Sequence, residues 1–183
     1  MREVELKSVV EDIKAARRNV ENAGGVLTFE GELLDLRWGD HGGVLELEDK
    51  VVRLRVYVRG NERSGSLDWK GPTTYEDGYK VREEISTTIG DPNALARILT
   101  GMGLHVIMSI DRHIAQYDLE GAVVRFERYP RMDDLVEVEG EPDAIERAIR
   151  AAGLPREGFN TDRLADFVAR YELRTGLKAA VSG

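Results

Sequence analysis

Short runs in which hydrophobic and polar residues alternate make up most of this chain, and Gly-rich or polar turns separate them. Alternation with a period of two is typical of antiparallel strands. The pattern predicts strands at Arg2–Val9, Glu32–Trp38, Val44–Glu48, Val51–Arg59, Ser66–Lys70, Tyr79–Thr88, His105–Asp118, Ala122–Arg128 and Asp134–Glu139. The chain is therefore expected to be mostly β.

Four helices interrupt these strands, and residues that favour helix ends mark them. They are expected at Glu11–Ala23, Asp91–Gly101 and Glu141–Gly153, and from Asn160 or Thr161 to Gly176. No repeat or interdomain linker divides the 183 residues, so we expect residues 1–183 to form a single domain. The tail after Lys178 is expected to fray and to be disordered.

The polar faces of six predicted strands consist of charged residues. Because side chains alternate along a strand, Glu3, Glu5 and Lys7 share one face, opposite Val4 and Leu6. The other charged faces carry Arg53 and Arg55; Asp68 and Lys70; Lys80, Arg82 and Glu84; Arg125 and Glu127; and Glu137 and Glu139. These charged faces are either the solvent-exposed side of an ordinary antiparallel sheet or the lining of a closed tunnel. Arg suits bidentate phosphate contacts and clustered Glu suits Mg²⁺ or Mn²⁺, which favours the tunnel.

The order of these segments resembles the CYTH superfamily, the triphosphate tunnel metalloenzymes, which includes class IV adenylyl cyclases, thiamine triphosphatases and inorganic triphosphatases. The family signature Glu-x-Glu-x-Lys is similar to Glu3-Val4-Glu5-Leu6-Lys7 at the N-terminus. The family's Arg-x-Arg, Lys-Gly-Pro, Arg-x-Glu and Glu-x-Glu-Gly segments look like Arg53–Arg55, Lys70–Pro72, Arg82–Glu84 and Glu137–Gly140. The resemblance covers nearly the whole chain.

This resemblance implies an α+β fold, in which a closed eight-stranded antiparallel β-barrel has a polar lumen and helices packed on its outside. It implies Mg²⁺ or Mn²⁺ as the cofactor, with Glu3, Glu5, Glu127, Glu137 and Glu139 facing the metal. It implies that the triphosphate contacts Lys7, Arg53, Arg55, Lys70, Arg82, Arg112 and Arg125. Catalytic roles would fall to Lys7, Arg82 and Glu84, with no covalent enzyme intermediate.

The chain departs from the family pattern at several positions. The usual Asp-x-aromatic pattern of the second strand keeps only Asp35, in Leu34-Asp35-Leu36-Arg37. Ser86 stands where the family often has another Glu, and Glu127 where it commonly has Asp. The roles of Asp35 and Ser86 therefore stay open.

A basic Lys-x-Arg stretch of the family is represented at best by Arg112, which lies between Asp111 and His113. This change either alters the substrate or is compensated by Arg125. The three histidines do not have metal-site spacing. His41 is therefore expected in a solvated loop, and His105 and His113 are expected to be structural. The last helix is expected to pack on the barrel, where it could close one mouth and bring Arg163 or Arg170 near the substrate.

Charge and composition narrow the class of protein. The formal net charge of −8 argues against a general nucleic-acid binder, and the absence of Cys excludes thiolate metal sites, thiol nucleophiles and disulfides. No apolar run approaches the roughly 18 residues of a membrane span, and the N-terminus is too charged for a signal peptide. We therefore expect a cytoplasmic monomer or homodimer whose partner is a small-molecule triphosphate or nucleotide.

Three functions fit this picture. The first is metal-dependent hydrolysis of an inorganic or organic triphosphate, and the second is the class IV adenylyl cyclase reaction, which converts ATP to cyclic AMP and pyrophosphate. Hydrolysis is favoured because it demands fewer specific contacts. The third is a polyphosphate or nucleotide sensor without turnover, which the retained glutamates make less attractive, because a pure anion binder would gain affinity by losing carboxylates.

Overall fold

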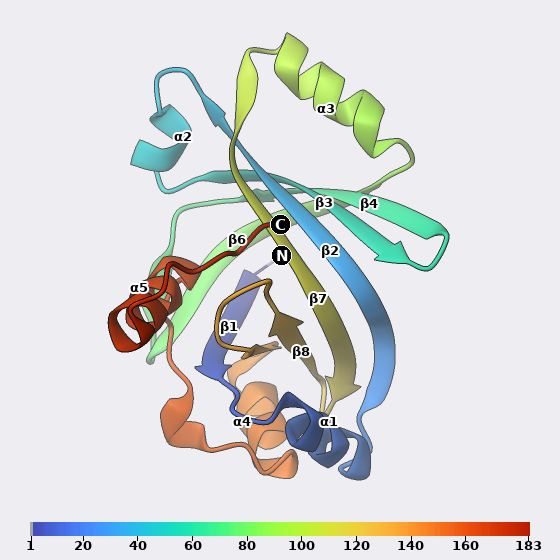
Figure 1. The fold of residues 1–183 in the computed structure, drawn as a ribbon, viewed down its shortest axis with the longest axis vertical. Coiled ribbons are helices and arrows are strands. Elements are labelled where there is room, and N and C mark those ends of the chain that lie inside the picture. The colour runs from blue at the N-terminus through green and yellow to red at the C-terminus, as the bar shows by residue number, and fades with distance from the viewer. Residues whose placement is uncertain (1) are drawn as a thin grey trace.

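The structure is a computed structural model that describes residues 2–183. Its strands are β1 (Arg2–Val9), β2 (Val26–Asp40), β3 (Val51–Arg59), β4 (Glu62–Lys70), β5 (Thr74–Glu76), β6 (Tyr79–Ile89), β7 (Leu104–Leu119), β8 (Ala122–Arg128) and β9 (Leu135–Glu139). They form one antiparallel sheet in the order β1-β9-β8-β7-β2-β3-β4-β6-β5 (Figure 1). Pairing of β1 with β6 closes eight of these strands, and the short β5 extends the sheet beside β6. The predicted closed barrel is confirmed.

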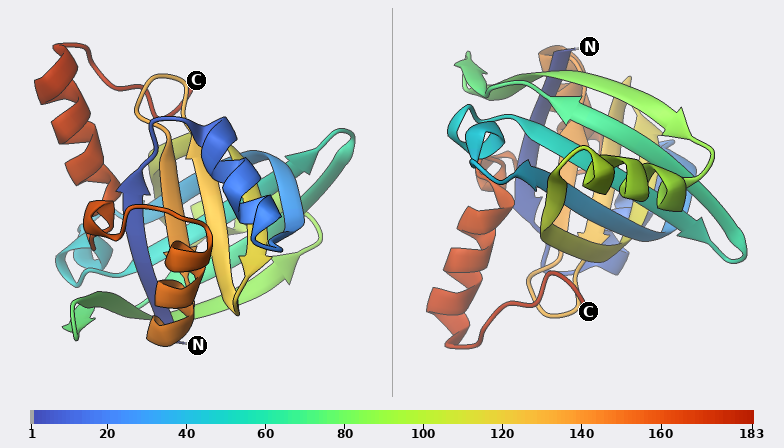
Figure 2. Two further views of the ribbon diagram at one scale, coloured as in Figure 1. Left: turned by 90° about the horizontal axis from the view of Figure 1, so that it is seen from below. Right: turned by 90° about the horizontal axis from the view of Figure 1, so that it is seen from above.

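The helices lie outside the barrel, as the views in Figure 2 show. They are α1 (Ile13–Asn22), α2 (Val44–Leu47), α3 (Pro92–Gly101), α4 (Pro142–Ala151), the 3₁₀ turn η1 (Arg156–Gly158) and α5 (Leu164–Thr175). Four of them, α1, α3, α4 and α5, are the helices that the sequence predicts. Among residues 2–183, no helix is long and apolar enough to cross a membrane.

The strand predicted at Val44–Glu48 is wrong, because these residues form the short helix α2. Both oxygens of the Asp40 carboxylate accept backbone N–H groups of the following turn, from Gly42 at 2.9 Å, Val44 at 3.1 Å and Leu45 at 3.0 Å. Gly43 has a positive φ of 65°, which strand geometry does not allow. The side-chain cap therefore outweighs the short alternating pattern.

The C-terminal tail differs from the expected fraying after Lys178. Ala180 forms an antiparallel bridge with Arg131 through two backbone hydrogen bonds of 2.8 and 3.1 Å. The backbone N–H of Asp111 donates to the carbonyl of Val181 at 2.8 Å. The tail is therefore attached to the barrel beside β7.

The apolar core lies between the barrel wall and the helices. The outward face of β1, with Val4 and Leu6, packs with Ile145 and Ile149 of α4 in the largest cluster of buried hydrophobic residues. A second cluster joins Trp38, Leu54 and Leu99 between β2, β3 and α3, and a third joins Ile110, Leu135 and Phe167 at α5. Most of the hydrophobic residues are buried outside the barrel, whereas the interior is lined mainly by charged side chains together with a few apolar ones such as Ile110.

Candidate active site

A cavity of about 480 Å³ lies inside the barrel, and charged side chains make up most of its wall. Its charged lining residues are Glu3, Glu5, Lys7, Asp35, Arg37, Asp49, Arg53, Arg55, Lys70, Lys80, Arg82, Arg112, Arg125, Glu127, Glu137 and Arg163. All the predicted site residues except Glu84 and Glu139 therefore line one cavity. These two glutamates lie beside it, each with a carboxylate oxygen within 4.8 Å of an oxygen of Glu3.

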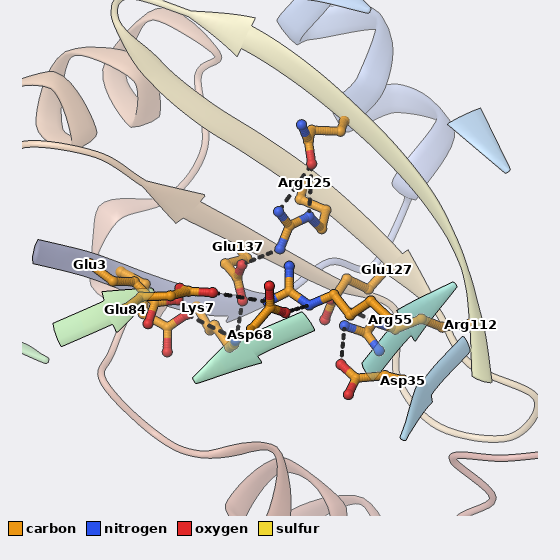
Figure 3. Close-up of polar contacts among 12 residues, drawn as sticks. Glu3, Lys7, Asp35, Arg55, Asp68, Glu84, Arg112, Arg125, Glu127 and Glu137 are labelled. Atoms are coloured by element: carbon orange, nitrogen blue, oxygen red, sulfur yellow. Dashed lines mark hydrogen bonds and ion pairs between the residues drawn. The ribbon is translucent and has the colours of Figure 1, made fainter. Parts of the chain in front are cut away.

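Three carboxylates form the most concentrated acidic group of the lumen. Glu3, Glu84 and Glu139 each offer an oxygen, and these oxygens lie within 4.8 Å of one another. Figure 3 shows Glu3 and Glu84 together, with Asp68 and Arg55 further along the lumen. Burial, together with the neighbouring carboxylates, raises the pKa of Glu3 to about 7, and burial also raises the pKa of Glu139. The cluster therefore favours a cation in its centre.

Two other predicted metal ligands, Glu5 and Glu137, each contact two basic side chains of the lumen. Burial opposes ionisation of Glu137, but Lys7 and Arg125 outweigh it and hold its pKa well below the usual value. Arg125 Nη1 donates to Glu137 Oε1 at 2.7 Å, and Lys7 Nζ contacts the other oxygen of the same carboxylate. Burial also opposes ionisation of Glu5, but Lys7 and Lys80, which contact its carboxylate, hold its pKa below the usual value. Glu5 and Glu137 are thus placed to hold these basic side chains in the lumen.

Glu127, also a predicted metal ligand, is buried beside Arg112 and Tyr129. Its Oε1 accepts a hydrogen bond of 2.8 Å from Arg112 Nε, and its Oε2 accepts one of 2.7 Å from the Tyr129 hydroxyl. Arg112 also lies 3.6 Å from the carboxylate of Asp35. Asp35, whose role the sequence left open, is therefore a partner of lumen arginines.

The sequence placed Asp68 on a charged face but gave it no role. In the structure Asp68 is 1% exposed, and its Oδ2 lies 3.2 Å from Arg53 Nε and 2.9 Å from Arg55 Nε. Its Oδ1 accepts a hydrogen bond of 2.6 Å from the Ser86 hydroxyl. A glutamate at position 86 would set a second negative charge against Asp68, so the serine and the aspartate fit each other. The signal available in the sequence was the position of Asp68 two residues before Lys70, on the same face of the strand.

Arg82, predicted to contact the triphosphate, donates two hydrogen bonds to backbone carbonyls. Its Nε donates to the carbonyl of Gly71 at 2.7 Å, and its Nη2 contacts the carbonyl of Asp49. Arg82 therefore ties the loop before β3 to the loop after β4 while its side chain lines the cavity.

Helix α5 lies at one opening of the cavity. Leu164, Ala165 and Val168 of this helix line the cavity, and Arg163 lies 3.3 Å from the carboxylate of Asp49. Arg170 pairs with Asp162 and is not among the lining residues. Of the two arginines considered from the sequence, the structure brings only Arg163 to the cavity.

The three histidines lie away from the cavity wall. His41 and His105 are exposed and stack on each other with ring centroids 4.8 Å apart. His113 lies 3.7 Å from Glu30 and 3.6 Å from Glu32. No histidine among the described residues takes part in the three-carboxylate cluster.

No protein-family model matches the sequence, and a search of curated proteins finds no match either. Solved structures do match. A proposed adenylate cyclase from Vibrio parahaemolyticus has a TM-score of 0.76 and 17% identity, over 91% of this chain and 97% of that chain. A protein from Pyrococcus horikoshii has a TM-score of 0.74 and 19% identity, over 92% and 98%.

A third match is a proposed adenylyl cyclase from Hippeastrum that is reported to have a dominant triphosphatase activity. Its TM-score is 0.64 and its identity 16%, over 96% of this chain and 95% of that chain. These matches show that the chain shares the fold of these solved structures along nearly its whole length. The fold is that expected of the CYTH superfamily, which agrees with the resemblance of the sequence segments.

Proposed function

We propose that this protein is a divalent-metal-dependent enzyme that hydrolyses a triphosphate-containing substrate inside the barrel. One observation carries the proposal: the carboxylates of Glu3, Glu84 and Glu139 lie within 4.8 Å of one another in a lumen that is otherwise rich in Arg and Lys. An acidic group of this kind next to basic side chains suits a phosphate chain and its metal ion together.

The residues of the cluster fit the proposed cofactor. Glu3, Glu84 and Glu139 would hold Mg²⁺ or Mn²⁺, because a donor set made only of carboxylate oxygens suits these hard cations. Burial is the main reason that the pKa of Glu3 is raised, and Glu5 and Glu84 add to it, so a divalent ion would offset the cost of holding these charges in the lumen. When bound, the metal would neutralise phosphate oxygens and lower the pKa of a coordinated water.

The basic residues would bind and orient the phosphate chain. Lys70 Nζ lies 3.1 Å from Glu84 Oε2, so it can contact a phosphate oxygen next to the metal cluster. Arg53 and Arg55 lie side by side on β3, anchored by Asp68, and offer guanidinium groups for bidentate contacts. Holding the substrate in one geometry supplies much of the catalysis in phosphoryl transfer.

The cyclase reaction is the second candidate. The apolar side chains of Met108, Leu164 and Val168 line the same cavity at its α5 end, so the wall also offers a surface for an organic group. Two of the three structural relatives named above, those from Vibrio parahaemolyticus and Hippeastrum, are described as proposed cyclases. The Hippeastrum protein is reported to have a dominant triphosphatase activity. That second description favours hydrolysis as the first candidate. The sensor is the third candidate, and the acidic cluster disfavours it.

A product analysis separates these functions. The purified protein is incubated with Mg²⁺ or Mn²⁺ and either inorganic triphosphate or ATP, and the products are resolved by ion-exchange chromatography. Release of orthophosphate supports the hydrolase, cyclic AMP with pyrophosphate identifies the cyclase, and binding without product identifies the sensor. Glu84→Gln should abolish turnover, whereas Glu146→Gln, which alters a carboxylate outside the cavity, should not.

A further inference from the structure

Arg37 on β2 differs from the other basic residues of the cavity. Its side chain lines the lumen, and its buried Nε, like that of Arg55, has no hydrogen-bond partner. Within residues 2–183 no carboxylate lies within 4.0 Å of its guanidinium. The other lumen arginines have such partners, as Arg53 does with Asp68 and Arg112 with Glu127.

The surroundings of Arg37 make this charge unfavourable. Burial lowers the pKa of Arg37, and although Asp35 opposes this effect, Arg112 and Arg82 add to it. On the neighbouring strand β3 the residue directly opposite Arg37 is Arg53. Two like charges facing each other across strands are destabilising, and a buried charge without a counter-ion costs free energy.

We infer that Arg37 binds a phosphate group of the substrate and supplies an additional contact to the phosphate chain. This inference rests on the proposed function, because it requires that a polyphosphate enters the lumen. Arg can hold two oxygens of one phosphate, and a phosphate would supply a negative charge at ion-pair distance, which no carboxylate of residues 2–183 supplies to Arg37. The family that the sequence resembles usually has an aromatic residue at the position of Arg37, so this contact lies outside the family pattern.

This role predicts opposite effects on stability and on binding. Arg37→Gln removes an uncompensated buried charge, so the melting temperature without substrate should stay the same or rise. The affinity for inorganic triphosphate should fall by about tenfold, the typical effect of losing a charged hydrogen bond. Arg112→Gln is the matched control: it also removes a lumen arginine, but it leaves Glu127 without its ion-pair partner and should lower the melting temperature.

The test first measures the melting temperature of each variant without ligand. Binding of inorganic triphosphate and of ATP is then measured separately by isothermal titration calorimetry, in EDTA to prevent turnover. Weaker binding of both ligands by Arg37→Gln would place Arg37 at a phosphate that both contain. Weaker binding of inorganic triphosphate with unchanged binding of ATP would place Arg37 at the terminal phosphate that carries the nucleoside in ATP. Arg37→Lys, which keeps the charge but not the planar fork, should restore part of the affinity.

Two results would overturn the inference. One is an Arg37→Gln protein whose affinity for both ligands stays within about twofold of the wild type. The other is a melting temperature that falls as far as that of Arg112→Gln, which would make Arg37 a structural residue. A wild-type protein that binds neither ligand, with or without Mg²⁺, would instead overturn the proposed function and this inference with it.

Discussion

Lys70 Nζ lies 3.1 Å from Glu84 Oε2 and also contacts Glu3, so one lysine pairs with two of the three carboxylates in the cluster. A divalent cation held by these carboxylates would compete with this lysine. Lys70→Gln should therefore bind Mn²⁺ about threefold or more tightly at pH 8, because a repelling charge is removed. The same variant should bind inorganic triphosphate about tenfold more weakly.

Both affinities can be followed by isothermal titration calorimetry. Lys50→Gln is a suitable control, since Lys50 pairs with Glu48 outside the cavity and its loss should change neither affinity. Weaker Mn²⁺ binding by Lys70→Gln would contradict the assignment of the cluster as the metal site.

The pKa of Glu3 predicts a pH dependence of stability. It is raised from 4.5 to about 7, so between these values the folded protein holds a proton that the unfolded chain has released. The stability of the metal-free protein should therefore fall as the pH rises from about 4.5 to 7, by up to about 3 kcal/mol. Urea unfolding in EDTA measures this, and Glu3→Gln should remove that part of the slope.

Glu5 and Glu137 contribute with the opposite sign. Their pKa values are lowered, so their stabilisation is present above the usual carboxyl pKa and is lost only as the pH falls below it. The two effects therefore occupy different pH ranges. If wild type and Glu3→Gln show the same slope between pH 4.5 and 7, the position of Glu3 in a repelling acidic cluster is wrong.

Asp68 should act as a positioning residue for Arg53 and Arg55. Asp68→Asn removes a negative charge beside both arginines, so attraction of the substrate should not weaken and KM should change by less than about threefold. Their alignment would be lost, and a misplacement of about 1 Å can lower kcat by about a hundredfold. We expect kcat to fall by about tenfold or more.

Ser86→Ala removes the hydroxyl that donates to Asp68 and should lower kcat by a smaller factor. Because the two residues act as a unit, Asp68→Asn combined with Ser86→Ala should be no worse than Asp68→Asn alone. A rise in KM with unchanged kcat would show that Asp68 does not align the arginines. Additive losses in the double variant would show that the hydroxyl acts independently of Asp68.

The two faces of β1 should respond differently to substitution. Leu6 lies on the outer face and is fully buried, so Leu6→Ala should lower the free energy of unfolding by about 2 to 5 kcal/mol through lost packing and a cavity. Its activity per folded molecule should stay near that of wild type, because Leu6 does not line the cavity. Chemical denaturation and steady-state kinetics on one preparation compare both effects, and intact stability in Leu6→Ala would contradict the outward-facing core.

The alternation of charged and apolar residues was enough to predict which face of each strand lines the barrel. Arg53, Glu137 and their neighbours lie where the pattern placed them, because a strand has only two faces and the apolar one must be buried. Partners within the lumen could not be predicted this way. Whether Glu84 or Glu5 joins Glu3 depends on strand stagger around the barrel, which a period of two does not specify.

The other differences between prediction and structure have separate causes. The helix at Val44–Leu47 depends on the cap from Asp40, which outweighs an alternating pattern of only five residues. Arg37 shares a face with Asp35, but its lack of a counter-ion appears only when all the strands are in place. The attachment of Ala180 to Arg131 joins segments that are distant in sequence and carries no periodic signal.

The most direct test of the account is the rate of orthophosphate release from inorganic triphosphate, measured against Mn²⁺ concentration for wild type and Glu84→Gln. Glu84→Gln keeps the shape of the side chain but replaces its carboxylate with a neutral amide, so a loss is not caused by altered packing. We predict metal-dependent release by the wild type, abolished by EDTA, and at least about a hundredfold slower release by Glu84→Gln. Equal rates for the two proteins, or release that continues in EDTA, would contradict a metal site formed by Glu3, Glu84 and Glu139.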